Sequence, residues 1–89
     1  MKFEWDENKN KSNQEKHSID FNDAKDVFND ENRKISEDLR HEYGESRWKV
    51  IGKIYGSIIS VIYTMRDAAV RIISARKASK KEREKYNGY

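Results

Sequence analysis

Three segments rich in β-branched residues, joined by two very short connections, limit most strongly how this chain can fold. The segments run from Trp48 to Ile54, from Ser57 to Met65 and from Ala69 to Arg76. Only Tyr55-Gly56 separates the first two segments, and only Arg66-Asp67-Ala68 separates the last two. Connections this short join antiparallel neighbours as hairpins. The spacing therefore predicts a three-stranded antiparallel meander.

The middle segment, Ser57 to Met65, is apolar in both phases of the alternation along a strand. One phase contains Ile58 and Ile62, and the other contains Ile59, Val61, Tyr63 and Met65. This pattern is typical of a central strand that is largely covered on both faces. We therefore expect the segment at the centre of the sheet.

The first 18 residues predict a strand followed by a helix. Aromatic and charged residues alternate from Lys2 to Trp5, which predicts a short strand at an edge of the sheet. Residues 7–17 are nearly all polar, and Asp6 before them is suited to cap a helix. Ser18 must end this helix, at a position where glycine does better because the turn requires a positive φ. We expect so polar a helix to be either loosely packed or presented for function.

Further elements complete a predicted α+β fold. Asp20 is suited to cap a second helix, whose apolar stripe should pack on the sheet. The stripe consists of Phe21, Ala24, Val27 and Phe28. Residues 33–39 resemble another strand, and Ser79 with Glu82 forms the pattern of a capping box. A C-terminal helix should follow and reach about Tyr86.

The size and composition of the chain favour one small domain over residues 1–89. A chain of 89 residues buries roughly 60 to 65 per cent of its unfolded surface, which permits one modest core. The sequence has no cysteine, so neither disulfides nor thiolate metal sites are expected. Its longest apolar run is far shorter than the roughly 20 residues of a membrane helix, and the N-terminal residues lack the apolar core of a signal peptide. We expect a cytoplasmic protein without a membrane partner.

Charge is distributed unevenly along the chain. Residues 1–45 carry 8 lysines and arginines against 13 acidic residues, whereas residues 46–89 carry 11 against 3. If the basic side chains of the predicted sheet share a face, that face would attract a polyanion, of which nucleic acid is the commonest in the cytosol. The alternative, equally compatible with composition, is that acidic helices neutralise a basic sheet within one fold.

Two common kinds of chemistry find no support in the sequence. His17 and His41 stand 24 positions apart, outside any metal-binding motif. No glycine-rich loop precedes a helix, so a nucleotide cradle is not predicted either. We expect neither a metal nor another cofactor.

Cleavage of RNA without a metal remains open, because the ribose supplies the 2′-hydroxyl nucleophile and the protein needs only to position it, move protons and stabilise charge. Arginine suits the last task because its guanidinium can contact two phosphate oxygens at once. The candidates for the catalytic site are Arg66, Arg71, Arg76, His17 and Glu45, with Glu37 and Asp38 as further proton carriers. The candidates for substrate binding are Arg47, Lys49, Lys53 and Tyr43. This hypothesis requires the guanidinium groups to converge on one spot of the sheet.

Less specific interpretations of the same residues stand beside this one. Each arginine can equally be a surface charge or a member of an ion pair, and His17 can simply be a favourable cation at the end of a helix. A non-catalytic module that binds RNA or a partner is the main alternative, with exposed aromatic rings stacking on bases. The aromatic candidates are Tyr43, Trp48, Tyr55, Tyr63, Tyr86 and Tyr89. Phe3, Trp5, Phe21, Phe28 and Trp48 are expected mainly in the core.

Several dispersed motifs together resemble the BrnT toxins of BrnT/BrnA type II toxin-antitoxin modules. The motifs are FEWDENKNKSNQEKHSIDFNDAKDVFND, EDLRHEYGESRWKVIG and YTMRDAAVRIISARKASKKEREKY. The resemblance extends from Phe3 to Tyr86 and departs at Ser18, where the family commonly has glycine. The matched polar positions are Lys9, Lys16, His17, Glu37, Asp38, Arg40, Tyr43, Glu45, Arg47, Arg66, Arg71, Arg76, Glu82, Arg83 and Tyr86.

The resemblance implies a bacterial ribonuclease with a RelE-like fold, in which helices pack on a small twisted antiparallel sheet. Such a toxin cleaves RNA without a metal and thereby slows translation. The resemblance also implies a BrnA-like antitoxin as a partner, whose ribbon-helix-helix domain binds operator DNA. Contact with DNA would then be made through the antitoxin alone.

Overall fold

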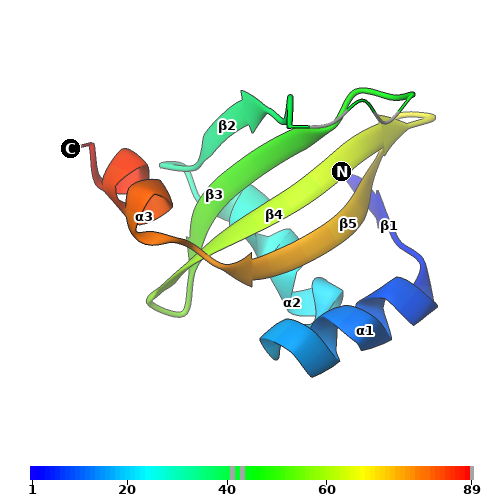
Figure 1. Ribbon diagram of the computed structural model, residues 1–89, viewed down its shortest axis with the longest axis horizontal. Helices are drawn as coiled ribbons and strands as arrows, with labels where there is room; N and C mark the ends of the chain where they lie inside the picture. The colour runs from blue at the N-terminus through cyan, green and yellow to red at the C-terminus, as the bar shows by residue number, and fades with distance from the viewer. Residues whose placement is uncertain (41, 43, 89) are drawn as a thin grey trace.

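The computed structural model describes residues 1–40, 42 and 44–88, which form a five-stranded sheet with helices packed against it (Figure 1). The strands are β1 (Lys2–Glu4), β2 (Lys34–Glu37), β3 (Trp48–Ile54), β4 (Ser57–Arg66) and β5 (Ala69–Lys77). The helices are α1 (Glu7–His17), α2 (Phe21–Ala24), the 3-10 helix η1 (Lys25–Asn29) and α3 (Lys80–Asn87). The predicted α+β class is confirmed.

The sheet has the strand order β1-β5-β4-β3-β2. Strands β3, β4 and β5 form the predicted antiparallel meander, with β4 at the centre of the sheet. The two-residue turns Tyr55-Gly56 and Asp67-Ala68 both have positive φ angles, the backbone form that matches the twist of a hairpin. At the edges, β2 is antiparallel to β3, and β1 is parallel to β5. The predicted edge position of the first strand is therefore confirmed.

One face of the sheet, called the core face here, carries the apolar core. In Figure 1 the sheet lies in front of α2, so the core face is turned away from the viewer. The buried residues of this cluster are Phe21, Ala24, Val27, Val50, Ile59, Val61, Tyr63, Val70, Ile72 and Ala75. The aromatic residues Phe3, Trp5, Phe28 and Trp48 pack around the cluster and are partly buried.

The second predicted helix is divided into α2 and the tighter 3-10 helix η1. η1 lies very close to β3, where a Cβ atom added to Gly52 would come within 3.0 Å of the Val27 Cβ. Gly52 therefore allows η1 to place Val27 in the core. The apolar stripe packs on the sheet as expected, although its backbone is not α-helical throughout.

Helix α1 is held by amide side chains rather than by an apolar stripe. Asn10 and Asn13 are buried. The Asn10 Oδ1 accepts a hydrogen bond from the Phe21 N–H at 2.9 Å, and the Asn13 Oδ1 accepts one from the Ala75 N–H on β5 at 3.0 Å. Asp6 caps the helix as predicted, and Ser18 ends it at a φ of 59°. The two amides thus explain how so polar a helix is fixed to the sheet.

The C-terminal helix begins with the predicted capping box. The Ser79 hydroxyl accepts from the Glu82 N–H, and the Glu82 carboxylate accepts from the Ser79 N–H. No helix among the described residues is long and apolar enough to span a membrane.

Candidate nucleic-acid interface

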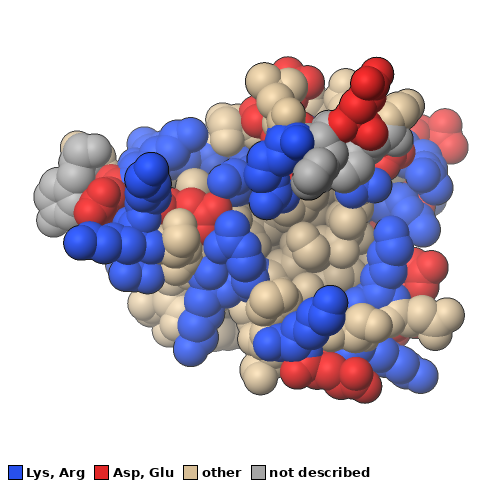
Figure 2. All heavy atoms as spheres, viewed as in Figure 1, with Lys and Arg blue, Asp and Glu red and all other residues tan. Residues whose placement is uncertain are grey.

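The face of the sheet opposite the core face, called the open face here, carries nearly all basic residues of the strands. The register places every strand lysine and arginine except Lys77 on it. These residues are Lys2, Lys34, Lys49, Lys53, Arg66, Arg71 and Arg76. Figure 2 views this face and shows Lys and Arg side chains around an uncharged central surface. Such a face suits a polyanion.

A β-bulge decides which side chains of β5 reach the open face. Arg71 and Arg76 are five residues apart, and in a regular strand such residues point to opposite faces. The pairing of β4 with β5 shifts between Ile62 and Tyr63, so that one extra residue of β5 is inserted. Arg71 consequently lies opposite Thr64, and Arg76 opposite Ser60. Both arginines therefore share the open face.

Arg76 belongs to a polar group centred on Glu82, called the Glu82 cluster here. The Arg76 Nη1 and Nη2 donate to the two Glu82 carboxylate oxygens at 2.7 and 3.0 Å. The Lys49 Nζ donates to the same carboxylate at 2.9 Å, and the Ser60 hydroxyl at 3.3 Å. α3 is thereby fixed over one end of the open face.

Glu82 is only 6% exposed, and its environment keeps it ionised. Burial by itself raises the pKa of a carboxyl group, but the hydrogen bonds from Arg76, the Ser79 N–H and Lys49 outweigh burial and hold the pKa of Glu82 well below its usual range. Sequence reasoning assigned Glu82 only a capping role. Its hydrogen bond with Lys49, through which it joins β3 to β5, could not be predicted from the sequence, because Lys49 is 33 residues away.

A second group, called the Glu45 cluster here, lies between the segment before β3 and the end of β4. The Glu45 carboxylate accepts a hydrogen bond from the Arg47 Nε at 3.3 Å and lies 3.7 Å from the Arg66 Nη2. The Thr64 hydroxyl donates to the Ser46 carbonyl oxygen at 2.7 Å and holds this segment against the open face. The Glu45 and Arg66 side chains are 32% and 52% exposed, so solvent and ligands can reach them.

Arg71 lies beside the Glu45 cluster and is bound to the neighbouring strand. Its Nη1 donates to the Glu4 carboxylate on β1 at 2.6 Å, and its Cα lies opposite Thr64. Since strands rise about 3.3 Å per residue, the Cα atoms of Arg71 and Arg76 are roughly 16 Å apart. The arginines therefore share one face without converging on one spot. Arg71 is near the Glu45 cluster, whereas Arg76 belongs to the Glu82 cluster.

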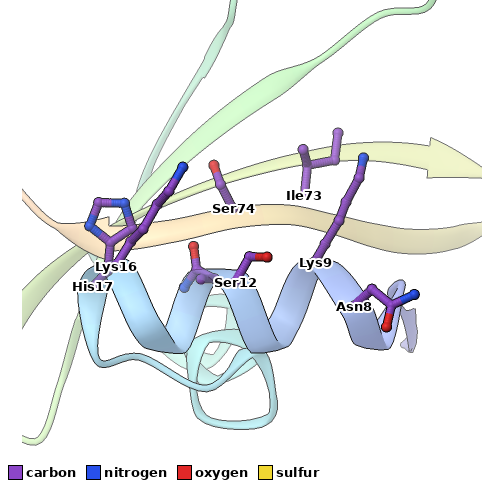
Figure 3. Close-up of a pocket in the computed structure, with 8 residues that line it drawn as sticks. Asn8, Lys9, Ser12, Lys16, His17, Ile73 and Ser74 are labelled. Carbon is purple, nitrogen blue, oxygen red and sulfur yellow. The ribbon is translucent and has the colours of Figure 1, made fainter.

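The other candidate residues lie elsewhere. His17 ends α1 and lines a groove between α1 and β5 (Figure 3). Lys53 lies beyond the Glu82 cluster, where its backbone N–H donates to Asp30 at 2.7 Å. Tyr43 lies outside the described residues, as do His41 and Tyr89.

The two further proton-carrier candidates, Glu37 and Asp38, differ in their surroundings. Glu37 lies opposite Trp48, so it is on the core face of β2 and not on the open face. Asp38 forms two hydrogen bonds with the Arg40 guanidinium at 2.8 and 3.0 Å. These bonds lower the pKa of Asp38 to about 2, so this carboxyl is a poor proton acceptor near neutral pH.

The exposed aromatic surface is smaller than the sequence suggests. Tyr63 is 6% exposed and belongs to the core, so the expectation that it could stack on a base is wrong. Its pKa is raised by burial. The Tyr86 hydroxyl donates to Asp30, and this bond raises the pKa of Tyr86 to about 12. Tyr55 is largely exposed, at the β3–β4 turn.

A model of a known protein family matches most of the chain. Residues 5–82 match a family model described as "Ribonuclease toxin, BrnT, of type II toxin-antitoxin system". No curated protein sequence matches the chain. Within the described residues, no group of three or more histidine, aspartate or glutamate side chains is arranged to hold a metal ion.

Proposed function

Since the chain belongs to the BrnT family of ribonuclease toxins of type II toxin-antitoxin systems, we propose that it cleaves RNA on its open face without a metal ion and thereby inhibits translation in the cytoplasm. The concentration of strand lysines and arginines on that one face carries the proposal. We further propose that residues 1–89 act as one toxin domain with a RelE-like fold. The antiparallel meander with helices on its core face is compatible with that fold.

The proposed reaction centre is the Glu45 cluster together with Arg71. Glu45 accepts the proton of the 2′-hydroxyl, whose oxygen attacks the adjacent phosphorus atom. The bond from phosphorus to the 5′-oxygen breaks, and the departing 5′-oxygen takes up a proton from water. Arg66 and Arg71 stabilise the negative charge that develops on the phosphate oxygens. The exposure of Glu45 and Arg66 allows a phosphodiester to displace part of the ion pairing that these side chains form with each other.

The remaining basic residues of the open face bind the RNA strand. Arg76 and Lys49 are held in place by Glu82, so they offer preorganised donors to phosphate groups. Lys53 extends the basic face beyond them. Arg47 orients Glu45 through its 3.3 Å hydrogen bond and contacts the substrate from the same side.

The partner of the protein follows from its family. A type II toxin has an antitoxin that binds it. We propose that this antitoxin is BrnA-like, with a ribbon-helix-helix domain that binds operator DNA. The toxin then contacts DNA only through its antitoxin.

A second candidate function is a module that binds RNA or a partner without cleaving it. One observation favours it: Arg66, Arg71 and Arg76 each have a carboxylate partner in the unliganded protein. In this second function the arginines, whose charges are already compensated, hold the fold and attract a ligand.

Incubation of the purified protein with RNA in EDTA distinguishes the two functions. Cleavage by attack of the 2′-hydroxyl leaves 2′,3′-cyclic phosphate ends, and a substrate methylated on its 2′-oxygens must resist cleavage. Both results support the proposal. Intact RNA together with measurable RNA binding would favour the non-catalytic module.

A further inference from the structure

A groove of about 330 Å³ runs between α1 and β5, away from the Glu45 and Glu82 clusters. Its lining residues are Asn8, Lys9, Ser12, Asn13, Lys16, His17, Ile73 and Ser74. In Figure 3 the side chains of Lys9 and Lys16 extend from α1 toward the side on which Ile73 and Ser74 project from β5. Ser74 lies opposite Ile62 of the open face. The groove therefore borders the surface proposed to bind RNA.

The chemistry of the lining is that of an anion site. It combines two lysines, a histidine, two amides and two hydroxyls, and it contains no carboxylate. Among the described residues, Lys9 and Lys16 form no ion pair, whereas Lys49, Arg66, Arg71 and Arg76 each do. An anion that enters the groove thus meets cationic groups whose charge is not already compensated by a carboxylate.

The sequence of α1 explains how these groups are placed together. Lys9, Ser12 and Lys16 are separated by three and four residues, so they lie on one side of the helix. Asn10 and Asn13 fix the neighbouring side to α2 and β5. The helix is thus a rigid support for the two lysines, which accounts for a segment with almost no apolar residue.

We propose that the groove between α1 and β5 is a phosphate-binding subsite for the RNA strand that crosses the open face. This inference rests on the proposed function, because it assigns the same substrate to a second location. Ser74 is three residues from Arg71 on β5, roughly 10 Å along the strand. One RNA chain can therefore contact the groove and the reaction centre at once.

The role of the subsite is to bind the strand and not to take part in the chemical step. Lysines that contact a phosphate away from the scissile bond stabilise the ground state and the transition state equally. Their loss then raises KM and leaves kcat unchanged. It also reduces the salt dependence of binding, because each phosphate contact to a single strand contributes about 0.7 to the slope of log K against log salt.

The test compares the double variant Lys9→Gln/Lys16→Gln with Lys11→Gln. Lys11 is exposed on the same helix and does not line the groove. Glutamine retains helix propensity, and circular dichroism checks that both variants are folded. The probe is a fluorescent RNA oligonucleotide methylated on every 2′-oxygen, so that its binding is measured without cleavage.

We expect the double variant to bind this probe about tenfold more weakly, with a salt slope lower by about 1.4 because two contacts are lost, whereas Lys11→Gln binds like the wild type. On cleavable RNA the double variant should show a higher KM at unchanged kcat. Wild-type affinity and salt slope in the double variant would overturn the subsite, even if the protein cleaves RNA. Absence of cleavage by the wild type, with weaker binding by the double variant, would instead refute the ribonuclease proposal and leave the subsite intact.

Discussion

Arg71 and Arg76, five residues apart on β5, point to the same face of the sheet because a β-bulge lies between them. Without the bulge, one of them would point into the apolar core. Val70 and Ile72 keep their core positions on one side of the bulge, and Ala75 keeps its position on the other. The bulge thus gives β5 both a continuous core face and a continuous basic face.

Two single-residue deletions test the bulge. Deletion of Ile73 removes the extra residue and leaves Ile72 directly before Ser74, so every other residue of β5 keeps its face and we expect a loss of only about 1–2 kcal/mol in the free energy of unfolding. Deletion of Ser60 from the regularly paired part of β4 instead forces one half of that strand to exchange its two faces, which removes Ile59 or Val61 from the core. Burial of each large aliphatic side chain contributes about 1.5–3 kcal/mol, so this deletion should cost about 3–6 kcal/mol. Equal losses in urea denaturation of the two variants would show that Ile73 is not an extra residue of the strand.

Glu82→Ala tests the central residue of the Glu82 cluster. The substitution removes the carboxylate that compensates the positive charges of Arg76 and Lys49 and that completes the capping box. We expect a loss of about 2–4 kcal/mol in the free energy of unfolding, measured by urea denaturation. Glu84→Ala on the same helix is the matched control and should change stability by less than about 0.5 kcal/mol. A loss no greater for Glu82→Ala than for this control would contradict the role assigned to Glu82.

The same carboxyl group predicts how stability depends on pH. The pKa of Glu82 is lower in the folded protein than the ordinary value of about 4.3 in an unfolded chain. The unfolded state therefore binds more protons below about pH 5, and the stabilisation present above that pH is lost as the pH falls. Asp38, with a pKa of about 2, adds to the loss between about pH 4 and pH 2. The free energy of unfolding of Glu82→Gln should fall less steeply than that of the wild type between about pH 6 and pH 3. An unchanged decline would mean that other groups cause the pH dependence.

Arg71→Ala and Glu4→Gln separate the catalytic role of Arg71 from its ion pair. Each variant breaks the ion pair between β1 and β5 but leaves their backbone pairing. Partly exposed ion pairs contribute only about 0–1 kcal/mol, so both variants should remain folded. If Arg71 stabilises charge on the scissile phosphate, Arg71→Ala lowers kcat about 100-fold or more, whereas Glu4→Gln retains cleavage. Equal losses of activity in both variants would show that only the ion pair matters.

The backbone at Ser18 predicts a stabilising substitution. Ser18 has a φ of 59°, a conformation that costs a residue with a Cβ about 1 kcal/mol and glycine much less. Ser18→Gly should therefore raise the melting temperature by about 3–6 °C. Lys11→Gly, in the exposed middle of the same helix, should lower it by a similar amount. A decrease for both variants would mean that the serine side chain contributes more than its backbone conformation costs.

The local elements were predictable because their signals are local. The hairpin spacings fixed β3, β4 and β5 to within a residue or so, and Asp6 and Ser79 marked the starts of α1 and α3. The parallel pairing of β1 with β5 had no such signal, because its residues are more than 60 positions apart.

The candidate site was predictable only in part for the same physical reason. The basic character of the sheet was evident from composition, but its division into two clusters depends on contacts between distant residues. Glu4 meets Arg71 across 67 positions, and Glu82 meets Lys49 across 33. The groove beside α1 was indicated only by the unusual polarity of that helix.

The central claim is that the open face binds RNA, and a titration of the ¹⁵N-labelled protein with 2′-O-methylated RNA tests it most directly. The account predicts that amide resonances of Thr64, Arg71 and Ser74 shift on binding, together with those of Lys9 and Lys16. It also predicts that resonances of Ile19 and Asp23, which line a pocket without any residue assigned to RNA binding, stay in place. Shifts confined to that pocket, with Thr64, Arg71 and Ser74 unaffected, would contradict the account.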